Sequence, residues 1–318
     1  MPNSGKLLDE PVVFFGSGPV AAKSLELLSE WADIEAVITK PKPAHHKGEF
    51  PVLEVAERLK LPVLTVSTKA GLDELMDTRP VRSRVAVLVD FGIIVSQGAI
   101  DYFELGIVNS HFSLLPEWRG ADPITFSILS GQQETGVSLM LLVDKMDEGP
   151  LLAQTPFELS PATTTPELTT DLIEVSDQTL RHILPLYAAG SIAPAPQEQA
   201  AIPGHQEASY SRKLTKADST LDFEHKPATQ LEREVRAYLE WPKSRTRIGE
   251  VDVIVTRAHV LEGEKLKVEG GVQAPGALYR NGKELGFYTT DDIFIVDLLK
   301  PAGKPEMSAA AFLAGYHL

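Results

Sequence analysis

The chain has 318 residues, a formal net charge of −14 and no cysteine. This length predicts about two domains, each large enough to enclose a core of its own. The lack of cysteine excludes disulfide bonds and thiolate metal sites, and no apolar run is long enough to span a bilayer. Because the first residues also lack the apolar core of a signal peptide, the sequence predicts a cytoplasmic protein.

The excess of acidic residues is confined to the first two thirds of the chain. Residues 209–318 contain 16 Lys and Arg against 16 Asp and Glu, whereas residues 1–208 contain 14 against 28. The net charge by itself argues against a nucleic-acid partner. The balanced C-terminal part can still present a basic face, although a balanced surface is the commoner state of a soluble domain.

Predicted strands and helices alternate through the first third of the chain. Residues 12–15 form a continuous apolar run, followed by Gly16-Ser17-Gly18-Pro19 and an Ala- and Leu-rich segment, which is typical of a buried strand, a tight turn and a helix. Further strands are expected at 34–38, 62–66 and 84–89, and helices at 52–59 and 72–76. This alternation predicts an α/β fold with a Rossmann-like, doubly wound, mostly parallel sheet.

The Gly16-Ser17-Gly18 turn also suggests a dinucleotide site. However, the third glycine of that motif is missing, and Thr39-Lys40 stands where an acidic residue would hold the ribose of NAD. We therefore expect no nicotinamide cofactor.

A basic loop follows at residues 40–48. By default, such a loop is interpreted as a connection exposed to solvent. Its adjacent histidines, His45 and His46, lack the spacing of metal ligands, so no metal is expected either.

Polar residues with catalytic potential gather between residues 107 and 150. If residues 107–111 form a strand, Asn109 and His111 point to one face, and Pro116 forces the chain out of the sheet soon afterwards. If the apolar run at 137–143 is a neighbouring strand, Asp147 in the turn after it can reach His111. Asn and His at a strand end are more often local hydrogen-bonding groups than catalysts, so spacing alone leaves both interpretations open.

The rest of the chain predicts one long helix, a connection and a small β domain. Residues 165–189 have helical periodicity, and residues 190–208 are rich in Ala, Pro and Gln, which indicates a surface linker or a strap packed on the first domain. Short strands with a helix near 229–238 follow, which favours a small barrel. The expected domains are residues 1–189, a linker at 190–208, and residues 209–318.

Several motifs together resemble the folate-dependent formyltransferases. They are Asn109-x-His111 followed by Ser-Leu-Leu-Pro, Trp118-Arg-Gly-Ala-x-Pro, Glu134-Thr-Gly-Val, Asp147-x-Gly149, and the later Tyr210-Ser-Arg-Lys-Leu-Thr. The resemblance implies formyl transfer from 10-formyltetrahydrofolate, with Asn109, His111 and Asp147 as catalytic residues, no metal, and an OB-like C-terminal barrel. It implies that folate is bound by two turns and one nearby acid: Phe91, Gly92, Ile93, Ser113, Leu114, Leu115, Pro116 and Asp144.

The resemblance is greatest to members that formylate charged initiator tRNA, so that tRNA is the expected acceptor and partner. The residues expected to bind it are Lys40, Lys42, Lys47, Arg212 and Lys213. The chain departs from the family pattern in Asp90-Phe91-Gly92, where the turn usually reads Ala-Tyr-Gly, in Glu148 and Pro150, where Thr and Asp are common, and in a shorter, less basic loop at 40–48. The alternatives are an N-formyltransferase acting on an amino sugar or another small amine, and a non-catalytic folate-binding or RNA-binding protein. A monomer without membrane contact is expected.

Overall fold

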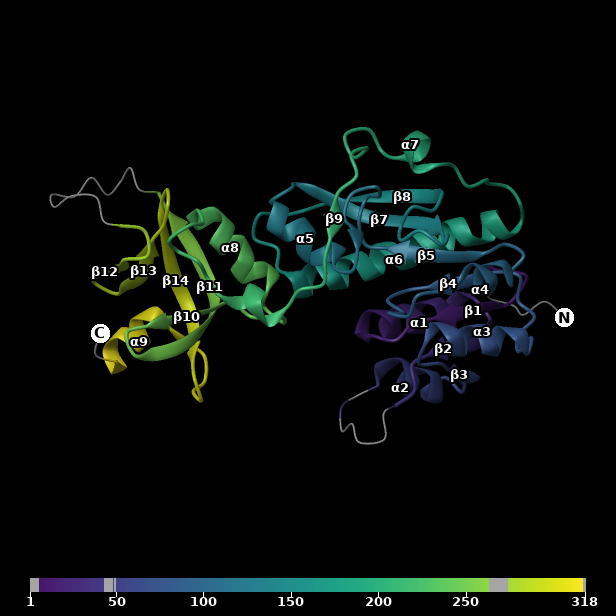
Figure 1. Ribbon diagram of the computed structural model, residues 1–318, viewed down its shortest axis with the longest axis horizontal. Helices are drawn as coiled ribbons and strands as arrows, with labels where there is room; N and C mark the ends of the chain where they lie inside the picture. Colours follow the sequence, from purple (N-terminus) through teal and green to yellow (C-terminus); the bar gives the residue numbers. More distant parts are fainter. Residues whose placement is uncertain (1–5, 43–47, 49, 263–273, 317–318) are drawn as a thin grey trace. The chain divides into compact units, whose positions relative to one another are not determined.

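A seven-stranded sheet organises the first part of the chain (Figure 1). The structure is a computed structural model that describes residues 6–42, 48, 50–262 and 274–316. The strand order is β3-β2-β1-β4-β5-β7-β8, in which the first five strands pair in parallel and β7 pairs antiparallel with both β5 and β8. The strands are β1 (Val12–Phe15), β2 (Ile34–Thr39), β3 (Val63–Thr65), β4 (Ala86–Leu88), β5 (Ile107–His111), β7 (Glu134–Leu141) and β8 (Leu151–Glu158).

Helices cover both faces of this sheet, which confirms the doubly wound α/β fold. Alternate residues of the central strands, such as Val13 and Phe15, pack with apolar residues of α3 and α4 in one buried cluster. On helix α1 outside that cluster, Trp31 donates a hydrogen bond to Asp177 of α6 at 2.8 Å. The helices are α1 (Pro19–Trp31), α2 (Pro51–Arg58), α3 (Lys69–Asp77), α4 (Gln97–Asp101), α5 (Pro123–Ser130), α6 (Thr165–Ala188) and α7 (Gln197–Ala200).

The parallel strands are buried along their whole length where the site forms. All four residues of β1 and all five of β5 are buried, as expected for strands with helices on both sides. The carboxyl ends of β1, β4 and β5 lie at one edge of the sheet because these strands are parallel neighbours. This edge is where ligands bind in open α/β folds.

The last part of the chain forms an antiparallel sheet of the kind found in small barrels. The strand order is β10-β11-β14-β13-β12, and β15 pairs with β14. Helices α8 and α9 contribute Leu231 and Phe312 to its buried core, where Phe223 stacks on Phe287 with ring centroids 4.0 Å apart. The elements are η1 (Lys216–Ser219), α8 (Ala228–Ala237), β10 (Arg245–Ile248), β11 (Val251–Leu261), β12 (Leu278–Asn281), β13 (Glu284–Tyr288), β14 (Ile293–Pro301), β15 (Met307–Ser308) and α9 (Ala309–Gly315).

Two compact units result from this arrangement. The first contains residues 1–123, 134–158 and 169–211, and the second contains residues 124–133, 159–168 and 212–318. The short strands β6 (Arg119–Gly120) and β9 (Tyr210–Ser211) pair in parallel within the first unit. The whole segment at 190–208, for which a linker or a strap was expected, belongs to the first unit.

Candidate active site

Two polar side chains lie at the carboxyl end of β5 on the same face. Asn109 is 7% exposed and His111 is 6% exposed. Backbone pairing of Asn109 with Leu88 of β4 and of His111 with Ser138 of β7 fixes the register of the strand. Ser110 between them points to the opposite face, where its hydroxyl lies 2.7 Å from that of Ser176. The predicted same-face placement of Asn109 and His111 is therefore present.

Asp147 lies beside His111, as the sequence predicted. The distance between Asp147 Oδ1 and His111 Nδ1 is 3.8 Å, which is an ion-pair distance longer than a hydrogen bond. The other carboxylate oxygen, Oδ2, accepts a hydrogen bond from the backbone N–H of Gly120 at 2.7 Å. Asp147 is 8% exposed and has φ +54°, a left-handed conformation that is uncommon for residues other than glycine.

The hydrogen bonds of His111 determine how its ring is oriented. Its Nε2 lies 3.1 Å from the carbonyl oxygen of Trp118. Because a carbonyl oxygen only accepts, Nε2 carries a hydrogen and Nδ1 faces the carboxylate of Asp147. Within the described part of the chain, the structure gives the Asn109 amide no hydrogen-bond partner. Its N–H groups can therefore be offered to a bound molecule.

The segment after β5 is tightly held by polar side chains. The hydroxyl of Ser138 accepts from the N–H of Leu115 at 2.9 Å and donates to the carbonyl of Ser113 at 2.7 Å. The side chain of Gln154 donates to the carbonyl of Leu115 at 2.8 Å. Leu114 and Leu115 are fully buried, and the Leu115–Pro116 peptide is cis. This part of the expected folate site is thus a rigid wall whose backbone groups at Leu115 are already bonded.

The turn after β4 is the second segment that was expected to bind folate. Phe91 is buried and packs edge-to-face on Phe15, whereas Ile94 is an exposed apolar residue. Gly92 has φ +65°, and a Cβ placed there would lie 2.7 Å from Nζ of Lys40. The ammonium of Lys40 therefore lies against this turn, and Gly92 leaves room for it. Asp144, also expected to bind folate, lies exposed three residues before Asp147.

The residues expected to bind tRNA differ in their surroundings. Lys42 is exposed, with its ammonium 5.4 Å from the ring centre of Phe50. Lys47 lies outside the described residues. Arg212 forms a two-pronged ion pair with Asp218, which holds the pKa of that carboxyl below its usual range. Lys213 is exposed. Both cations expected in the second unit are therefore exposed, and Arg212 is engaged in an ion pair.

Sequence reasoning missed a set of residues that hold the site from the strap, which we define as residues 195–211. Gln197 is 3% exposed and contacts the Asp147 turn, and Ser209 accepts from the backbone N–H groups of Trp118 and Arg119. The Ala- and Pro-rich composition of this segment gave no apolar periodicity. No sequence pattern distinguishes Gln197 from its exposed neighbours Glu198 and Gln199, so no signal pointed to it.

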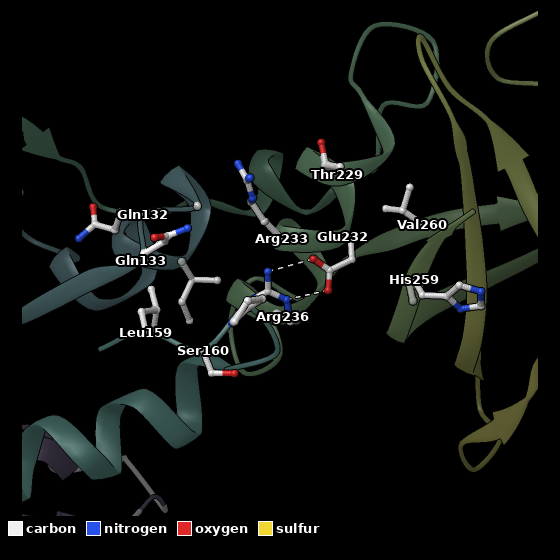
Figure 2. Close-up of a pocket in the computed structure, with 14 residues that line it drawn as sticks. Gln132, Gln133, Leu159, Ser160, Thr229, Glu232, Arg233, Arg236, His259 and Val260 are labelled. Carbon is white, nitrogen blue, oxygen red and sulfur yellow. Dashed lines mark hydrogen bonds and ion pairs between the residues drawn. The ribbon is translucent and has the colours of Figure 1, made fainter. Parts of the chain in front are cut away.

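A separate cavity of about 420 Å³ lies within the second unit. Figure 2 shows that Arg236 and Glu232 form a two-pronged ion pair there. Arg236 also donates to the carbonyl of Thr163 at 2.8 Å, and Arg233 donates to that of Ser130 at 3.2 Å. The lining residues are Ile128, Gly131, Gln132, Gln133, Leu159, Ser160, Pro161, Thr229, Glu232, Arg233, Arg236, Ala258, His259 and Val260. None of the expected site residues that the structure describes lines it.

Among the described residues, no group of three His, Asp or Glu side chains could hold a metal ion. No helix in the same residues is long and apolar enough to cross a membrane.

Comparison with known proteins matches nearly the whole chain to one family. Residues 12–184 match the formyl transferase domain, and residues 213–317 match the formyl transferase C-terminal domain. A methionyl-tRNA formyltransferase of Roseiflexus castenholzii is 33% identical, and one of Halorhodospira halophila is 35% identical; each alignment covers 96% of both chains.

Solved structures agree at the level of the fold. An N-formyltransferase from Helicobacter canadensis, in complex with folinic acid and dTDP-3-aminofucose, superposes with a TM-score of 0.64 at 15% identity. The superposition covers 90% of this chain and 98% of that one. Since the sequence matches span both domains and the expected residues meet at the sheet edge, the chain belongs to the formyl transferase family.

Proposed function

We propose that this protein transfers the formyl group of 10-formyltetrahydrofolate to the amino group of methionyl initiator tRNA for translation initiation. The observation that carries the proposal is the meeting of Asn109, His111 and Asp147 at the carboxyl end of β5, in a chain 33% identical to a methionyl-tRNA formyltransferase. We assign the catalytic role to these three residues.

The roles of the three residues follow from the chemistry of formyl transfer. The acceptor amine attacks the formyl carbon, the formyl oxygen gains negative charge, and the bond to N10 of the folate then breaks. The site must therefore donate hydrogen bonds to the oxygen and take a proton from the attacking nitrogen. The amide of Asn109 donates to the oxygen. His111 in its protonated form exchanges its Nε2 hydrogen bond to the Trp118 carbonyl for one to the oxygen, while its Nδ1 faces Asp147, which stabilises that form and relays the proton through water.

Two features of the described residues fit the folate donor. The exposed apolar side chain of Ile94 and the backbone at Gly92 offer a flat ring both an apolar surface and polar main-chain groups. The tightly held segment at 113–116 is the second feature. We accordingly propose that the two turns, Phe91-Gly92-Ile93 and Ser113-Leu114-Leu115-Pro116, with Asp144, bind the donor.

We propose that three segments of the chain have different roles in the reaction with tRNA. Residues 1–189 would form the catalytic domain, residues 190–208 a connection, and residues 209–318 a domain that assists tRNA binding. Lys40, Lys42, Lys47, Arg212 and Lys213 would contact phosphates. We place the reaction in the cytoplasm, and the protein would act as a monomer.

A small amine is the second candidate acceptor. Glu148 and Pro150 occupy positions where tRNA-specific members commonly have Thr and Asp. The carboxylate of Glu148 lies 3.8 Å from Arg119, beside Asp147, so this departure affects the site itself. An amino-sugar acceptor would need no phosphate contacts along an extended backbone.

The direct test is product formation by the purified protein. With 10-formyltetrahydrofolate and methionyl initiator tRNA, the expected products are formylmethionyl-tRNA and tetrahydrofolate in equal amounts. The His111→Ala variant under the same conditions is the control for contaminating activity. A protein that releases tetrahydrofolate only when an amino sugar is added would overturn the proposal.

A further inference from the structure

The turn that carries Asp147 needs support from outside itself. Residues 142–150 connect β7 to β8, and within them Lys145, Met146 and Glu148 are exposed while Asp147 is buried. The left-handed backbone conformation of Asp147 is unfavourable for a residue with a Cβ. Such a conformation persists only where the surrounding structure holds it, and it is often found at functional sites.

The support comes from Gln197 in the strap. Its Nε2 donates to the carbonyl oxygen of Asp147 at 2.8 Å and to that of Gly149 at 2.9 Å. Its Oε1 accepts from Nη2 of Arg119 at 2.6 Å. Both N–H groups and the oxygen of the amide are therefore used. Glutamate cannot replace this arrangement, because it has no donor for the two carbonyls at neutral pH.

Asp147 is therefore fixed from two directions by one connected group. Its main chain is held by Gln197, and its carboxylate is held by the N–H of Gly120, the residue after Arg119. Arg119 joins the two supports, since its guanidinium binds Gln197 and its backbone N–H donates to Ser209 of the strap at 3.0 Å.

The strap is itself anchored on both sides of Gln197. Ala195 exchanges two backbone hydrogen bonds with Leu151, at 2.8 and 2.9 Å. Further along, the N–H of Ile202 donates to Gln154 at 2.9 Å. A buried side chain between two such anchors has little freedom, so it can set the position of the turn it contacts.

We propose that Gln197 is a positioning residue of the formyl-transfer site, which holds the Asp147 turn so that its carboxylate faces His111. The inference rests on the proposed function, because it requires that Asp147 takes part in catalysis. It assigns to the segment between the two domains a task in the chemistry, in addition to joining them.

The test substitutes Gln197 by methionine, which has a similar length and volume but no donor for the two carbonyls. The Gln197→Met variant should lower kcat by about 10-fold to 100-fold, the scale of a misplaced catalytic group. The Michaelis constant for 10-formyltetrahydrofolate should change by less than about twofold, because the hydrogen bonds of Gln197 go to Arg119, Asp147 and Gly149, which are not among the residues proposed to bind the donor. Gln199→Met is the matched control on the exposed side of α7 and should leave kcat unchanged.

Combining Gln197→Met with Asp147→Asn distinguishes a positioning role of Gln197 from a general structural role. In the Asp147→Asn background, adding Gln197→Met should lower kcat by less than about threefold, since residues that act as one unit are not additive. Circular dichroism and thermal unfolding confirm that each variant is folded before kinetics are compared.

Three outcomes would overturn the inference, and they are distinguishable from one another. Unchanged kcat in Gln197→Met, with an impaired Asp147→Asn variant, would overturn the role of Gln197 alone. An equal fold-loss from Gln197→Met in both backgrounds would show that Gln197 supports the fold without positioning Asp147. Unchanged kcat in Asp147→Asn would overturn the proposed role of Asp147, and the inference with it.

Discussion

Substituting either of the two residues on the catalytic face of β5 should lower turnover and leave binding of the folate donor nearly unchanged. Asn109→Ala and His111→Ala each remove a hydrogen-bond donor for the developing negative charge, so each should lower kcat by about 100-fold or more. The Michaelis constant for the folate donor should change little. Steady-state kinetics with varied donor, at saturating acceptor, measure both quantities.

Ser110→Ala is the matched control for these variants. Ser110 lies on the same strand between the two catalytic residues but faces away from them, where it bonds to Ser176. Its loss should cost about 1 kcal/mol of stability and leave kcat unchanged. If Asn109→Ala or His111→Ala behaved in the same way as Ser110→Ala, the assignment of the site to this face of β5 would be wrong.

At the scale of elements, the strap should make the first unit sensitive to pH through His205. The ring lies 2.9 Å from Glu134 and 3.1 Å from Glu117. Burial works against the charged ring, but the two carboxylates outweigh burial and raise the pKa of His205 above 6.5. Stability from this group is therefore fully present below about pH 6.5 and is lost as the pH rises through the folded-state pKa.

The His205→Gln variant tests this linkage. It should unfold about 2 °C below the wild type at pH 6, a difference that corresponds to about 1 kcal/mol or less for a partly exposed pair, and the difference should shrink by pH 9. Thermal unfolding followed by circular dichroism at both pH values measures it. A difference that grows with pH would contradict the assignment of the charged ring.

Sequence patterns predicted the elements that depend on apolar burial. Strand β1 and helix α6 were expected almost at their observed bounds, because continuous apolar runs and helical periodicity reflect burial directly. Helix α5 was not predicted, since it buries Thr125 and Ser127 and so has no clear apolar stripe. Strand β7 begins at Glu134, earlier than expected, because Gly136 lets the carbonyl of Thr155 approach closely.

The sequence also predicted one part of the candidate site and not the other. The spacing of Asn109 and His111 placed both on one face, and the expectation that Asp147 can reach His111 was correct. The contribution of the strap could not be predicted, because Gln197 and Ser209 act through hydrogen bonds to backbone atoms far away in sequence. Such bonds leave no periodic pattern, and they depend on a left-handed turn at Asp147 that the sequence does not specify.

At the scale of the whole molecule, a tRNA acceptor requires contacts with several phosphates. Raising the salt concentration from about 50 to 200 mM should therefore lower kcat/KM for methionyl initiator tRNA by at least about tenfold, whereas a small amine would show a shallow dependence. Changing Lys40 and Lys42 to Ala should raise the Michaelis constant for tRNA and flatten the salt dependence. Changing Lys23 and Lys69, which are exposed on α1 and α3, is the charge-matched control and should do neither.

The identity of the acceptor is the central claim, and one comparison tests it most directly. The measurement is the ratio of kcat/KM for methionyl initiator tRNA to kcat/KM for a nucleotide-linked amino sugar, at one donor concentration and at both salt concentrations. At low salt the ratio should exceed about 100, because only the tRNA can use both the site and the basic residues outside it, and it should fall as salt rises. A ratio below one, unaffected by salt, would contradict the account and identify the protein as a formyltransferase for small amines.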